Sequence, residues 1–361
     1  MMAADIGVLV GTAKGLFVLR GGAAPGWEIS GPFLRGQEVY ALAWARSDGR
    51  PRVLAGIHSA HWGPSVVWSD DLGGTWDERE AGSVRFPDDV DAAVQRVWQI
   101  HPDSDGVVWA GVEPAALFRS GDGGVTFELV RGLWDHPHRP QWMPGGGGLC
   151  LHTIVPDPVT PERMWVAVST GGVYRTEDGG ASWQARNRGI ATPFLPGDDP
   201  PEFGQCVHKM ALTPAVPERM FLQHHWGVYR SDDGGDNWTS VGQTLPSDFG
   251  FPVVVHPDDP DTVYVIPLES DEFRVTPGGR CRVYRSTDAG ASWDALTDGL
   301  PQHDAYLTVL RDAFTASTQP AGLFFGTRTG EVFATLDGGE HWTALAGHLP
   351  PVLSVRAATL E

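Results

Sequence analysis

One short phrase recurs six times along this chain of 361 residues. Each copy begins with Ser or Thr and has Asp at its third position, Gly at its fifth and Trp or Phe at its eighth. The copies are Ser69–Trp76, Ser120–Phe127, Thr176–Trp183, Ser231–Trp238, Ser286–Trp293 and Thr335–Trp342. Their Asp residues are spaced roughly 50 to 56 residues apart, a period typical of the blades of a β-propeller.

The physical chemistry of this phrase, called the box below, explains why it repeats. Asp and Ser side chains bond to nearby backbone amides and hold a tight turn, while Gly supplies the positive φ that such a turn needs. The Trp that follows is expected to bury its ring between sheets. We therefore predict that the box Asp residues are structural, and we assign them no catalytic role.

A seventh unit is divided between the two ends of the sequence. Gly11–Phe17 resembles Gly326–Val332, and Arg20–Trp27 keeps the length and the Trp of a box but has lost the Asp. This unit lacks an inner strand, which Val352–Ala357 can supply. We therefore predict an all-β, seven-bladed β-propeller whose ring is closed by the C-terminal strand joining the N-terminal blade, which leaves no open sheet edge.

The repeat also predicts the domain organisation, one propeller over residues 1–361. Each blade is expected to have four strands, with the box between the third and the fourth. The blades are predicted at about 5–29 plus 352–359, 38–78, 93–130, 149–186, 205–241, 251–297 and 305–345.

The charge balance limits the partners. Lys and Arg total 26 against 45 Asp and Glu, a formal net charge of -19. Nucleic acids and anionic membranes bind through positive surfaces, so we expect neither as a partner. Three Cys residues in a chain of this length predict no disulfide framework. The N-terminal stretch lacks a basic leader, and Lys14 breaks its apolar run, so we expect a strand there and a cytoplasmic protein.

The long insertions predict which face of the propeller is functional. They are Arg79–Gln95, Arg131–Gly148, Arg188–Gln205 and Glu269–Cys281, and strand direction puts them on the face opposite the boxes. Long loops on a rigid scaffold usually form lids or binding surfaces. We therefore expect a small-molecule or carbohydrate ligand on that face, with a protein partner as the alternative.

Aligning the blades directs a group of His and Glu residues towards the mouth of the central channel. These residues are His58, Glu113, His152, His208 and His224. Imidazole and carboxylate suit Zn, Fe or Mn, so we predict one divalent metal on His152, His208 and His224. Glu113 is the candidate base, with His58 beside it. The alternatives are a metal-free acid–base site and buried, hydrogen-bonded core histidines.

Other residues near this group are candidates for binding a substrate. They are Trp98, Trp226, Glu269 and Arg274, together with His138 and Trp142 of the predicted lid 131–148. Arg96 and Arg328 are candidate catalytic residues that anchor an anionic group, and surface ion pairs are the alternative. Asp271 and Glu272 adjoin Arg274 and suit acid–base chemistry or a capping role.

Two Cys residues stand in the same pattern in neighbouring blades, as Cys150-x-His152 and Cys206-x-His208. Residues two apart share one face of a strand, so a thiolate can assist a metal there. The alternative is that both Cys are small buried hydrophobic residues.

The boxes resemble those of the Asp-box, or bacterial neuraminidase repeat, family. That family includes sialidases, tandem-propeller glucanases, sorting receptors and photosystem II assembly factors. The chain has no Arg-Ile-Pro motif and no Tyr–Glu pair that a motif places, so the sialidase catalytic residues cannot be carried over. The glucanases work between two propellers, whereas the assembly factors are single propellers that bind protein. The predicted His site also resembles, by analogy of site only, the four-His iron centre of carotenoid oxygenases.

Three hypotheses follow for function, and the sequence does not decide whether the chain is an enzyme. The first is an enzyme with a His/Glu-lined, metal-dependent site at the channel mouth. The second is a non-catalytic interaction or assembly propeller. The third is a sialidase-like glycoside hydrolase. The fold barely separates them, because propellers carry many functions.

Overall fold

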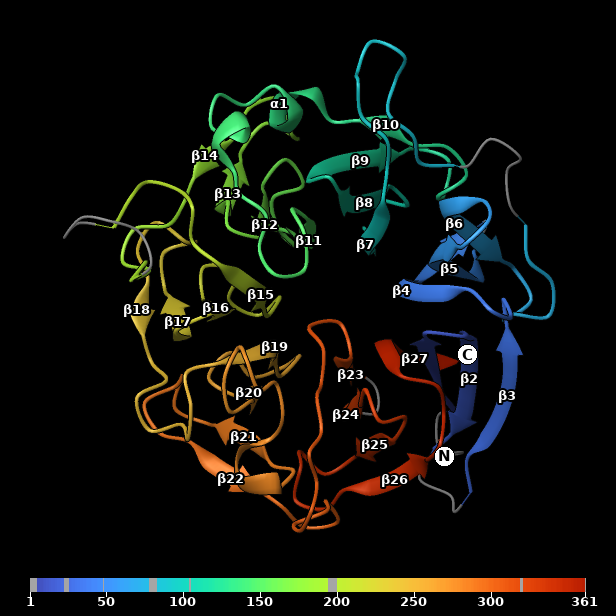
Figure 1. The fold of residues 1–361 in the computed structure, drawn as a ribbon, viewed down its shortest axis with the longest axis vertical. Helices are drawn as coiled ribbons and strands as arrows, with labels where there is room; N and C mark the ends of the chain where they lie inside the picture. Colours follow the sequence, from blue (N-terminus) through green and yellow to red (C-terminus); the bar gives the residue numbers. More distant parts are fainter. Residues whose placement is uncertain are drawn as a thin grey trace. The chain divides into compact units, whose positions relative to one another are not determined.

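The computed structural model describes residues 5–22, 26–47, 49–77, 83–103, 105–193, 200–318 and 321–360. The strands form seven sheets, and the fold is the predicted all-β, seven-bladed β-propeller (Figure 1). Six sheets have four strands, and one has three. None of the helices among these residues has the length and apolar character needed to cross a membrane.

The chain divides into two compact units. Unit 1 comprises Met1–Pro32 with His208–Glu361, and unit 2 comprises Phe33–Val207. The division falls inside strand β15 (Val207–Leu212), whose sheet otherwise lies in unit 1. The interpretation of residues 1–361 as one domain, with the blade limits given above, stays a prediction.

Unit 1 contains four of the sheets and their connecting segments. Their strands are β1 (Asp5–Thr12), β2 (Gly15–Gly21), β3 (Glu28–Phe33) and β27 (Val352–Leu360); β15, β16 (Met220–His224), β17 (Gly227–Ser231) and β18 (Thr239–Ser240); β19 (Gly250–Val255), β20 (Val263–Pro267), β21 (Val283–Ser286) and β22 (Asp294–Leu296); and β23 (Phe314–Thr318), β24 (Ala321–Gly326), β25 (Val332–Thr335) and β26 (Thr343–Ala346). A short 3-10 helix, η2 (Pro277–Gly279), precedes β21.

The C-terminal strand joins the N-terminal blade, as predicted. Strand β27 pairs antiparallel with β1, with Val10 opposite Val355 and Asp5 opposite Leu360. Val10 and Val355 are fully buried. The last strand therefore contributes to the core and covers an edge of β1 that would otherwise be open to pairing with another chain.

Unit 2 contains the other three sheets. Their strands are β4 (Glu38–Ser47), β5 (Arg50–Ser59) and β6 (Gly63–Ser69); β7 (Arg96–Pro102), β8 (Val108–Glu113), β9 (Ala116–Ser120) and β10 (Glu128–Leu129); and β11 (Leu151–Pro156), β12 (Met164–Val168), β13 (Gly172–Thr176) and β14 (Gln184–Ala185). Helices α1 (Arg131–Trp134) and η1 (Arg139–Gln141) follow β10. In the sheet of β4, Trp68 and Asp77 form a bridge where a fourth strand was predicted, and the residues that follow, 78–82, lie outside the described ones.

The boxes hold their turns by the hydrogen bonds that their composition predicts. Ser69 Oγ lies 2.8 Å from Asp71 Oδ1, and the Gly73 N–H donates to Ser69 Oγ at 2.8 Å. The Thr75 N–H donates to the same carboxylate at 2.8 Å. The bonds that Asp71 accepts, the backbone bond from Thr75 first and then that from the Ser69 hydroxyl, lower the pKa of Asp71 to about 2. The Asp71 carboxylate therefore accepts hydrogen bonds from within its own turn.

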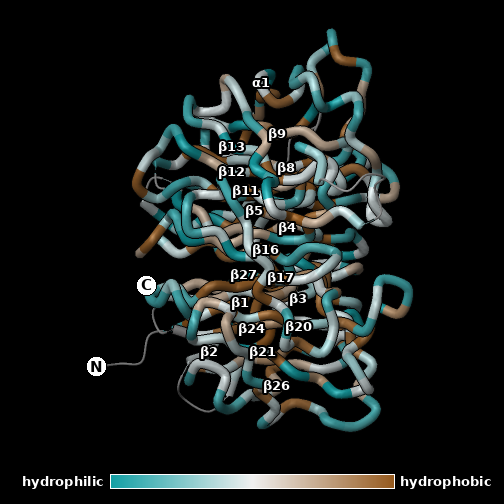
Figure 2. The backbone as a smooth tube through the Cα atoms, turned by 90° about the vertical axis from the view of Figure 1, so that its left-hand side faces the viewer, coloured by the Kyte–Doolittle hydropathy of each residue, from teal (hydrophilic) through white to brown (hydrophobic). Residues whose placement is uncertain are grey.

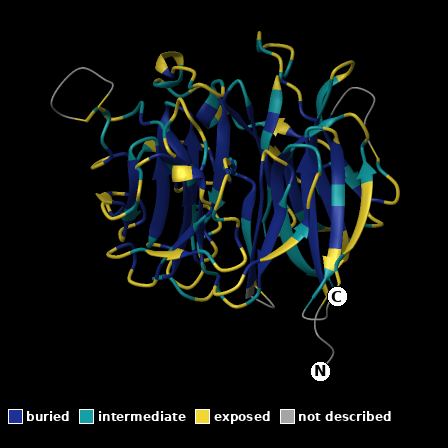
Figure 3. Ribbon diagram, turned by 60° about the horizontal axis from the view of Figure 1, so that its bottom comes forward, coloured by how far each residue is buried: buried dark blue, intermediate teal, exposed yellow. Residues whose placement is uncertain are grey.

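The cores of both units are built from the strands. Figure 3 shows the strands largely buried and their connections largely exposed, and Figure 2 shows hydrophobic stretches recurring along the strands. Large aromatic side chains such as Trp165 and Tyr174 in unit 2, and Trp342 in unit 1, are almost fully buried. This scaffold leaves the loops to carry the site.

Candidate functional site

Five aromatic side chains of unit 1 form one group, called the unit 1 cluster below. They are His208 of β15, His225 and Trp226 of the turn between β16 and β17, and Phe249 and Phe251 at the start of β19. The His208 ring lies 5.4 Å from His225, 5.2 Å from Phe249 and 5.1 Å from Phe251, measured between centroids. The His225 ring lies 4.2 Å from Trp226.

Charged residues border this cluster. Asp271 Oδ2 lies 3.3 Å from His225 Nε2. The guanidinium groups of Arg274 and Arg311 lie 5.6 and 6.0 Å from the centre of the Phe251 ring, at distances typical of cation–π contacts. Arg274 Nε also donates to the Asp271 carbonyl at 2.8 Å. Asp271 and Arg274 are exposed, so the cluster is open to solvent through this loop.

Burial changes the acid–base character of the two cluster histidines. Burial, with the positive charge of Arg311 adding to it, holds the pKa of His208 well below its usual range. Burial also lowers the pKa of His225, although the carboxylate of Asp271 opposes that shift. Both imidazoles are therefore neutral near pH 7, the form in which a histidine accepts a proton or binds a metal.

Two exposed aromatic rings lie on the loop of Asp271 and on the segment bonded to that loop. Phe273 is 51% exposed and Tyr306 is 54% exposed, while Trp226 is half-buried. The segment of Tyr306 is tied to the loop of Asp271, because Thr308 Oγ1 donates to the Arg274 carbonyl. The Tyr306 ring packs against Gly279, where a Cβ atom would come within 3.2 Å of it. We call these three rings the aromatic rim: Trp226 belongs to the cluster, Phe273 lies on the loop of Asp271, and Tyr306 lies on the segment bonded to that loop.

Cys206 directly precedes strand β15, two residues before His208. One ligand atom each from Cys206, His208 and His225 lie within 4.8 Å of one another. Among the residues that the structure describes, this is the one group of three or more His, Cys, Asp or Glu side chains close enough to hold a metal ion.

The structure places two of the predicted metal ligands, His152 and His224, in the core. Both are fully buried. The ring nitrogens of His152 lie 3.0 Å from Thr153 Oγ1 and 3.0 Å from the Val207 carbonyl. The Trp226 N–H donates to His224 Nδ1 at 3.2 Å, and burial lowers the pKa of His224 to about 3. Of the predicted metal trio, His208 alone belongs to the group that the structure brings together.

A second group, called the unit 2 cluster below, contains three predicted site residues: Arg96, Trp98 and Glu113. Trp98 Nε1 donates to Glu113 Oε2 at 3.1 Å, and an Arg96 guanidinium nitrogen lies 3.5 Å from the same oxygen. The Arg96 guanidinium also lies 4.4 Å from the centre of the Tyr40 ring. Gly148 has a φ of 96°, and a Cβ there would lie 1.9 Å from Glu113 Oε1, so only glycine fits.

The predicted lid is packed against its own blade. Trp142 is buried, and its Nε1 donates to the Tyr174 hydroxyl at 2.8 Å. His138 Nδ1 lies 3.2 Å from the same hydroxyl, and the His138 ring stacks on Phe203 at 4.1 Å. Both side chains therefore hold the loop in place instead of facing a ligand.

The remaining predicted residues are dispersed. His58 Nδ1 lies 3.7 Å from Glu38 Oε2, which makes a partly exposed pair across β4 and β5. Glu269 and Arg328 are exposed in unit 1, and Arg328 donates its backbone N–H to Thr308. The predicted loop Arg79–Gln95 lies partly outside the described residues, at 79–82, and so does Arg188–Gln205, at 194–199.

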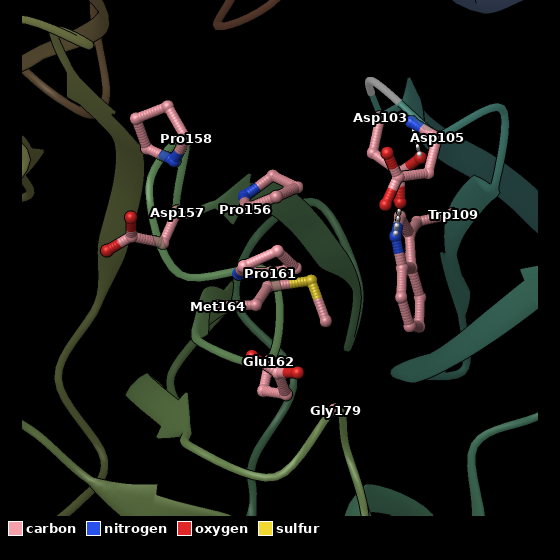
Figure 4. A pocket seen from close by; sticks show the side chains of 10 residues that line it. All are labelled: Asp103, Asp105, Trp109, Pro156, Asp157, Pro158, Pro161, Glu162, Met164 and Gly179. Atoms are coloured by element: carbon pink, nitrogen blue, oxygen red, sulfur yellow. Dashed lines mark hydrogen bonds between the residues drawn. The ribbon is translucent and has the colours of Figure 1, made fainter.

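An acidic pocket of unit 2 was not predicted (Figure 4). It is lined by Asp103, Asp105, Trp109, Asp157 and Glu162, among others. The Asp103 carboxylate accepts the Val107 N–H at 2.9 Å, and the Asp157 carboxylate accepts the Val159 N–H at 2.7 Å. These acids hold the turns between first and second strands, and the acid-rich turns themselves are the sequence signal for the pocket.

The cluster residue that sequence alignment missed is His225. The alignment of strand ends takes one residue from each blade, and it selected His224. His225 lies in the turn after β16, one residue beyond the strand end that the alignment used. The His224–His225 doublet was the signal that could have identified it.

Comparison with known proteins gives distant likenesses. No family model matches the chain. Xyloglucanase Xgh74A of Acetivibrio thermocellus is 23% identical over 266 residues, which are 63% of this chain and 30% of that protein. A xyloglucanase of a Paenibacillus species is 24% identical over 56% of this chain and 22% of its own length. The chain thus spans less than a third of the curated relatives named here.

Solved structures show the same fold at low identity. An ancestral GH74 enzyme superposes with a TM-score of 0.55 at 17% identity, over 90% of this chain and 40% of that one. YCF48 bound to D1 peptide superposes with a TM-score of 0.52 at 14% identity, over 90% and 88% of the two chains. YCF48 from Cyanidioschyzon merolae gives 0.54 at 13%, over 86% of each chain. These likenesses establish the propeller fold and leave function to the site.

Proposed function

We propose that this chain is a carbohydrate-binding propeller, related in function to glycoside hydrolases, and that its glycan site is the unit 1 cluster with its aromatic rim. The observation that carries the proposal is that three rings adjoin Asp271 and Arg274. Phe273 lies on their loop, Tyr306 lies on a segment bonded to that loop, and Trp226 packs on His225, the partner of Asp271. The similarity of the sequence to xyloglucanases supports the same ligand class.

The chemistry of the rim suits a sugar. A pyranose ring presents apolar C–H groups on its faces and hydroxyl groups around its edge. Aromatic side chains offer a large flat surface for the faces. Asp271 accepts hydrogen bonds from hydroxyls, and Arg274 donates several in one plane.

Hydrolysis is the finer form of this proposal. Glycoside hydrolases need two carboxyl groups beside the bond that is cleaved. Glu269, Asp271 and Glu272 supply exposed acids on one loop next to the cluster. Asp271 stands beside His225, so it is the first carboxylate to test for cleavage.

The test is calorimetric titration of the full chain with xyloglucan oligosaccharides and cello-oligosaccharides, with malto-oligosaccharides as comparison ligands. We expect Trp226→Ala and Tyr306→Ala each to weaken binding about tenfold, a loss typical of an aromatic anchor. The control is Trp62→Ala, because Trp62 is 92% exposed and lies in unit 2.

Two results would overturn the proposal: no binding to any of these glycans, or equal binding by wild type and Trp226→Ala. The same samples, analysed for released sugars, test cleavage. We expect Asp271→Asn to abolish any release while it leaves binding within about tenfold, because loss of a catalytic group acts on the chemical step.

A second candidate function is binding of a protein segment, and it has its own observation. Trp62 is 92% exposed and Met143 is 66% exposed, both in unit 2. A YCF48 structure with a bound peptide provides a propeller precedent. Selection of peptides from a display library on wild type, with loss of capture by Trp62→Ala, would favour this function.

A further inference from the structure

The group of Cys206, His208 and His225 goes beyond the proposed function. Cys206 and His208 are two residues apart and share one face of the strand segment. His225 follows β16, which lies in the same sheet as β15. One ligand atom of each side chain lies within 4.8 Å of the other two. Hydrogen bonding across one sheet thus brings a thiol and two imidazoles together.

We propose that Cys206, His208 and His225 form a binding site for a transition metal ion of the zinc type. A thiolate and two imidazoles are the ligands that zinc prefers, and three protein ligands leave a fourth position for water or a substrate oxygen. Metal bonds of about 2.0 to 2.3 Å place tetrahedral ligand atoms about 3.5 Å apart. The three ligand atoms already lie within 4.8 Å of one another, so they need to close by at most about 1.3 Å.

The partners of the two imidazoles fix which nitrogen carries the lone pair. His208 Nδ1 lies 2.6 Å from the Gly250 carbonyl, and a carbonyl can only accept, so Nδ1 carries the proton and Nε2 the lone pair. His225 Nε2 lies 3.3 Å from the Asp271 carboxylate, which favours a proton on Nε2 and a lone pair on Nδ1. Metal-binding histidines usually have such a carbonyl or carboxylate partner on the other nitrogen. Asp271 is therefore a positioning residue for the ion.

The neighbouring Cys-x-His pair provides a built-in control. Cys150 Sγ lies 3.0 Å from Ser169 Oγ, and both nitrogens of His152 have the partners described above. No third ligand joins this pair among the described residues. The same two-residue pattern therefore forms a metal group in one blade and a hydrogen-bonded core in the other.

The ion would supply Lewis-acid chemistry next to the aromatic rim, where it can polarise a ligand hydroxyl or a water. Metal binding is measured without any glycan, so its failure and the failure of the carbohydrate proposal are separate outcomes.

The experiment uses the full chain, purified without a histidine tag and stripped with a chelator. It is titrated with Zn²⁺ by calorimetry and with Co²⁺ by absorption spectroscopy. We expect about one equivalent of either ion, and thiolate-to-cobalt charge-transfer bands in the near ultraviolet. Cys206→Ser and His225→Ala should each weaken binding about 100-fold or more, and Asp271→Asn about tenfold to 100-fold.

The control variant is Cys150→Ala, which should bind as wild type does. Cys206→Ser is nearly isosteric, and circular dichroism verifies that each variant is folded. The proposal is overturned if wild type binds neither ion, or if Cys206→Ser keeps both the affinity and the charge-transfer bands. Equal losses in Cys150→Ala and Cys206→Ser would also overturn it, because they would show a general effect of removing a thiol.

Discussion

The unit 1 and unit 2 clusters combine similar residues in different ways. Each has aromatic rings together with an arginine and a carboxylate, which belong to the unit 2 cluster and border the unit 1 cluster; both carboxylates lie close to the end of a second strand. In unit 2, the Glu113 carboxylate is 14% exposed and accepts from Trp98 while it pairs with Arg96. In unit 1, the Asp271 carboxylate is 50% exposed and lies on a loop beside His225. The first carboxylate is enclosed by its partners, and the second remains open to a ligand.

The difference arises from the loops. The glycine-rich end of loop 131–148 closes over Glu113, with Gly148 in contact distance of the carboxylate. The loop 269–276 instead exposes Asp271, Phe273 and Arg274. In unit 2, Glu113 with Arg96 and Trp98 thus forms a structural brace. In unit 1, the corresponding region is a candidate site. The inserted loops determine this difference.

The largest expected effect tests the brace of unit 2. Gly148→Ala puts a Cβ where Glu113 Oε1 lies, at a φ of 96° that only glycine adopts easily. The carboxylate must then leave Arg96 and Trp98. We expect a loss of about 3 kcal/mol in the free energy of unfolding, measured by urea denaturation. Zinc and glycan binding in unit 1 should not change, and a variant as stable as wild type would contradict the brace.

A smaller effect is expected from Glu113→Gln, which keeps the shape of the side chain and removes its charge. Arg96 is 25% exposed and would lose the carboxylate that balances it. We expect a loss of about 1.5 kcal/mol on urea denaturation. The matched control is Glu269→Gln in unit 1, which is exposed and should stay within about 0.5 kcal/mol of wild type. Equal losses in both variants would remove the distinction between the clusters.

The fold could be predicted from the sequence because its defining chemistry is local. Each box contains the donors and acceptors for its own turn, so six copies imply six similar hairpins without knowledge of the rest. The position of the C-terminal strand was predicted because the N-terminal blade lacks an inner strand in its own part of the sequence. The bridge between Trp68 and Asp77 lies where the outer strand of that blade was predicted, and the residues that follow, 78–82, lie outside the described ones.

The candidate site could be predicted only in part, because burial and side-chain partners depend on neighbouring elements. The repeat period identified the strand that carries His208. It did not show that His224 is enclosed or that Trp142 is bonded to Tyr174, since those partners are distant in the sequence or belong to a turn. It also selected His224 over His225, because the alignment used the ends of the strands and His225 lies in the turn that follows β16.

The smallest expected effect tests whether the box carboxylates of the two units contribute equally to stability. Asp178 in unit 2 and Asp288 in unit 1 each have a pKa of about 2, lowered from 3.8 chiefly by hydrogen bonds from Ser182 and Ser292 respectively. A carboxyl whose folded pKa lies below its unfolded pKa stabilises the protein above the unfolded value, and that contribution is lost as the pH falls towards the folded value. Stability should therefore decrease between about pH 4 and pH 2, more steeply in wild type than in Asp178→Asn or Asp288→Asn.

The two box variants should lose this pH dependence to the same small extent, because both carboxylates are exposed and lie in the same kind of turn. Thermal unfolding at a series of pH values measures it. Unequal slopes would show that the boxes differ between the units, and the contrast between the clusters would then extend to the scaffold. Equal slopes confine the contrast to the loops, where the enclosed Glu113 and the exposed Asp271 already differ.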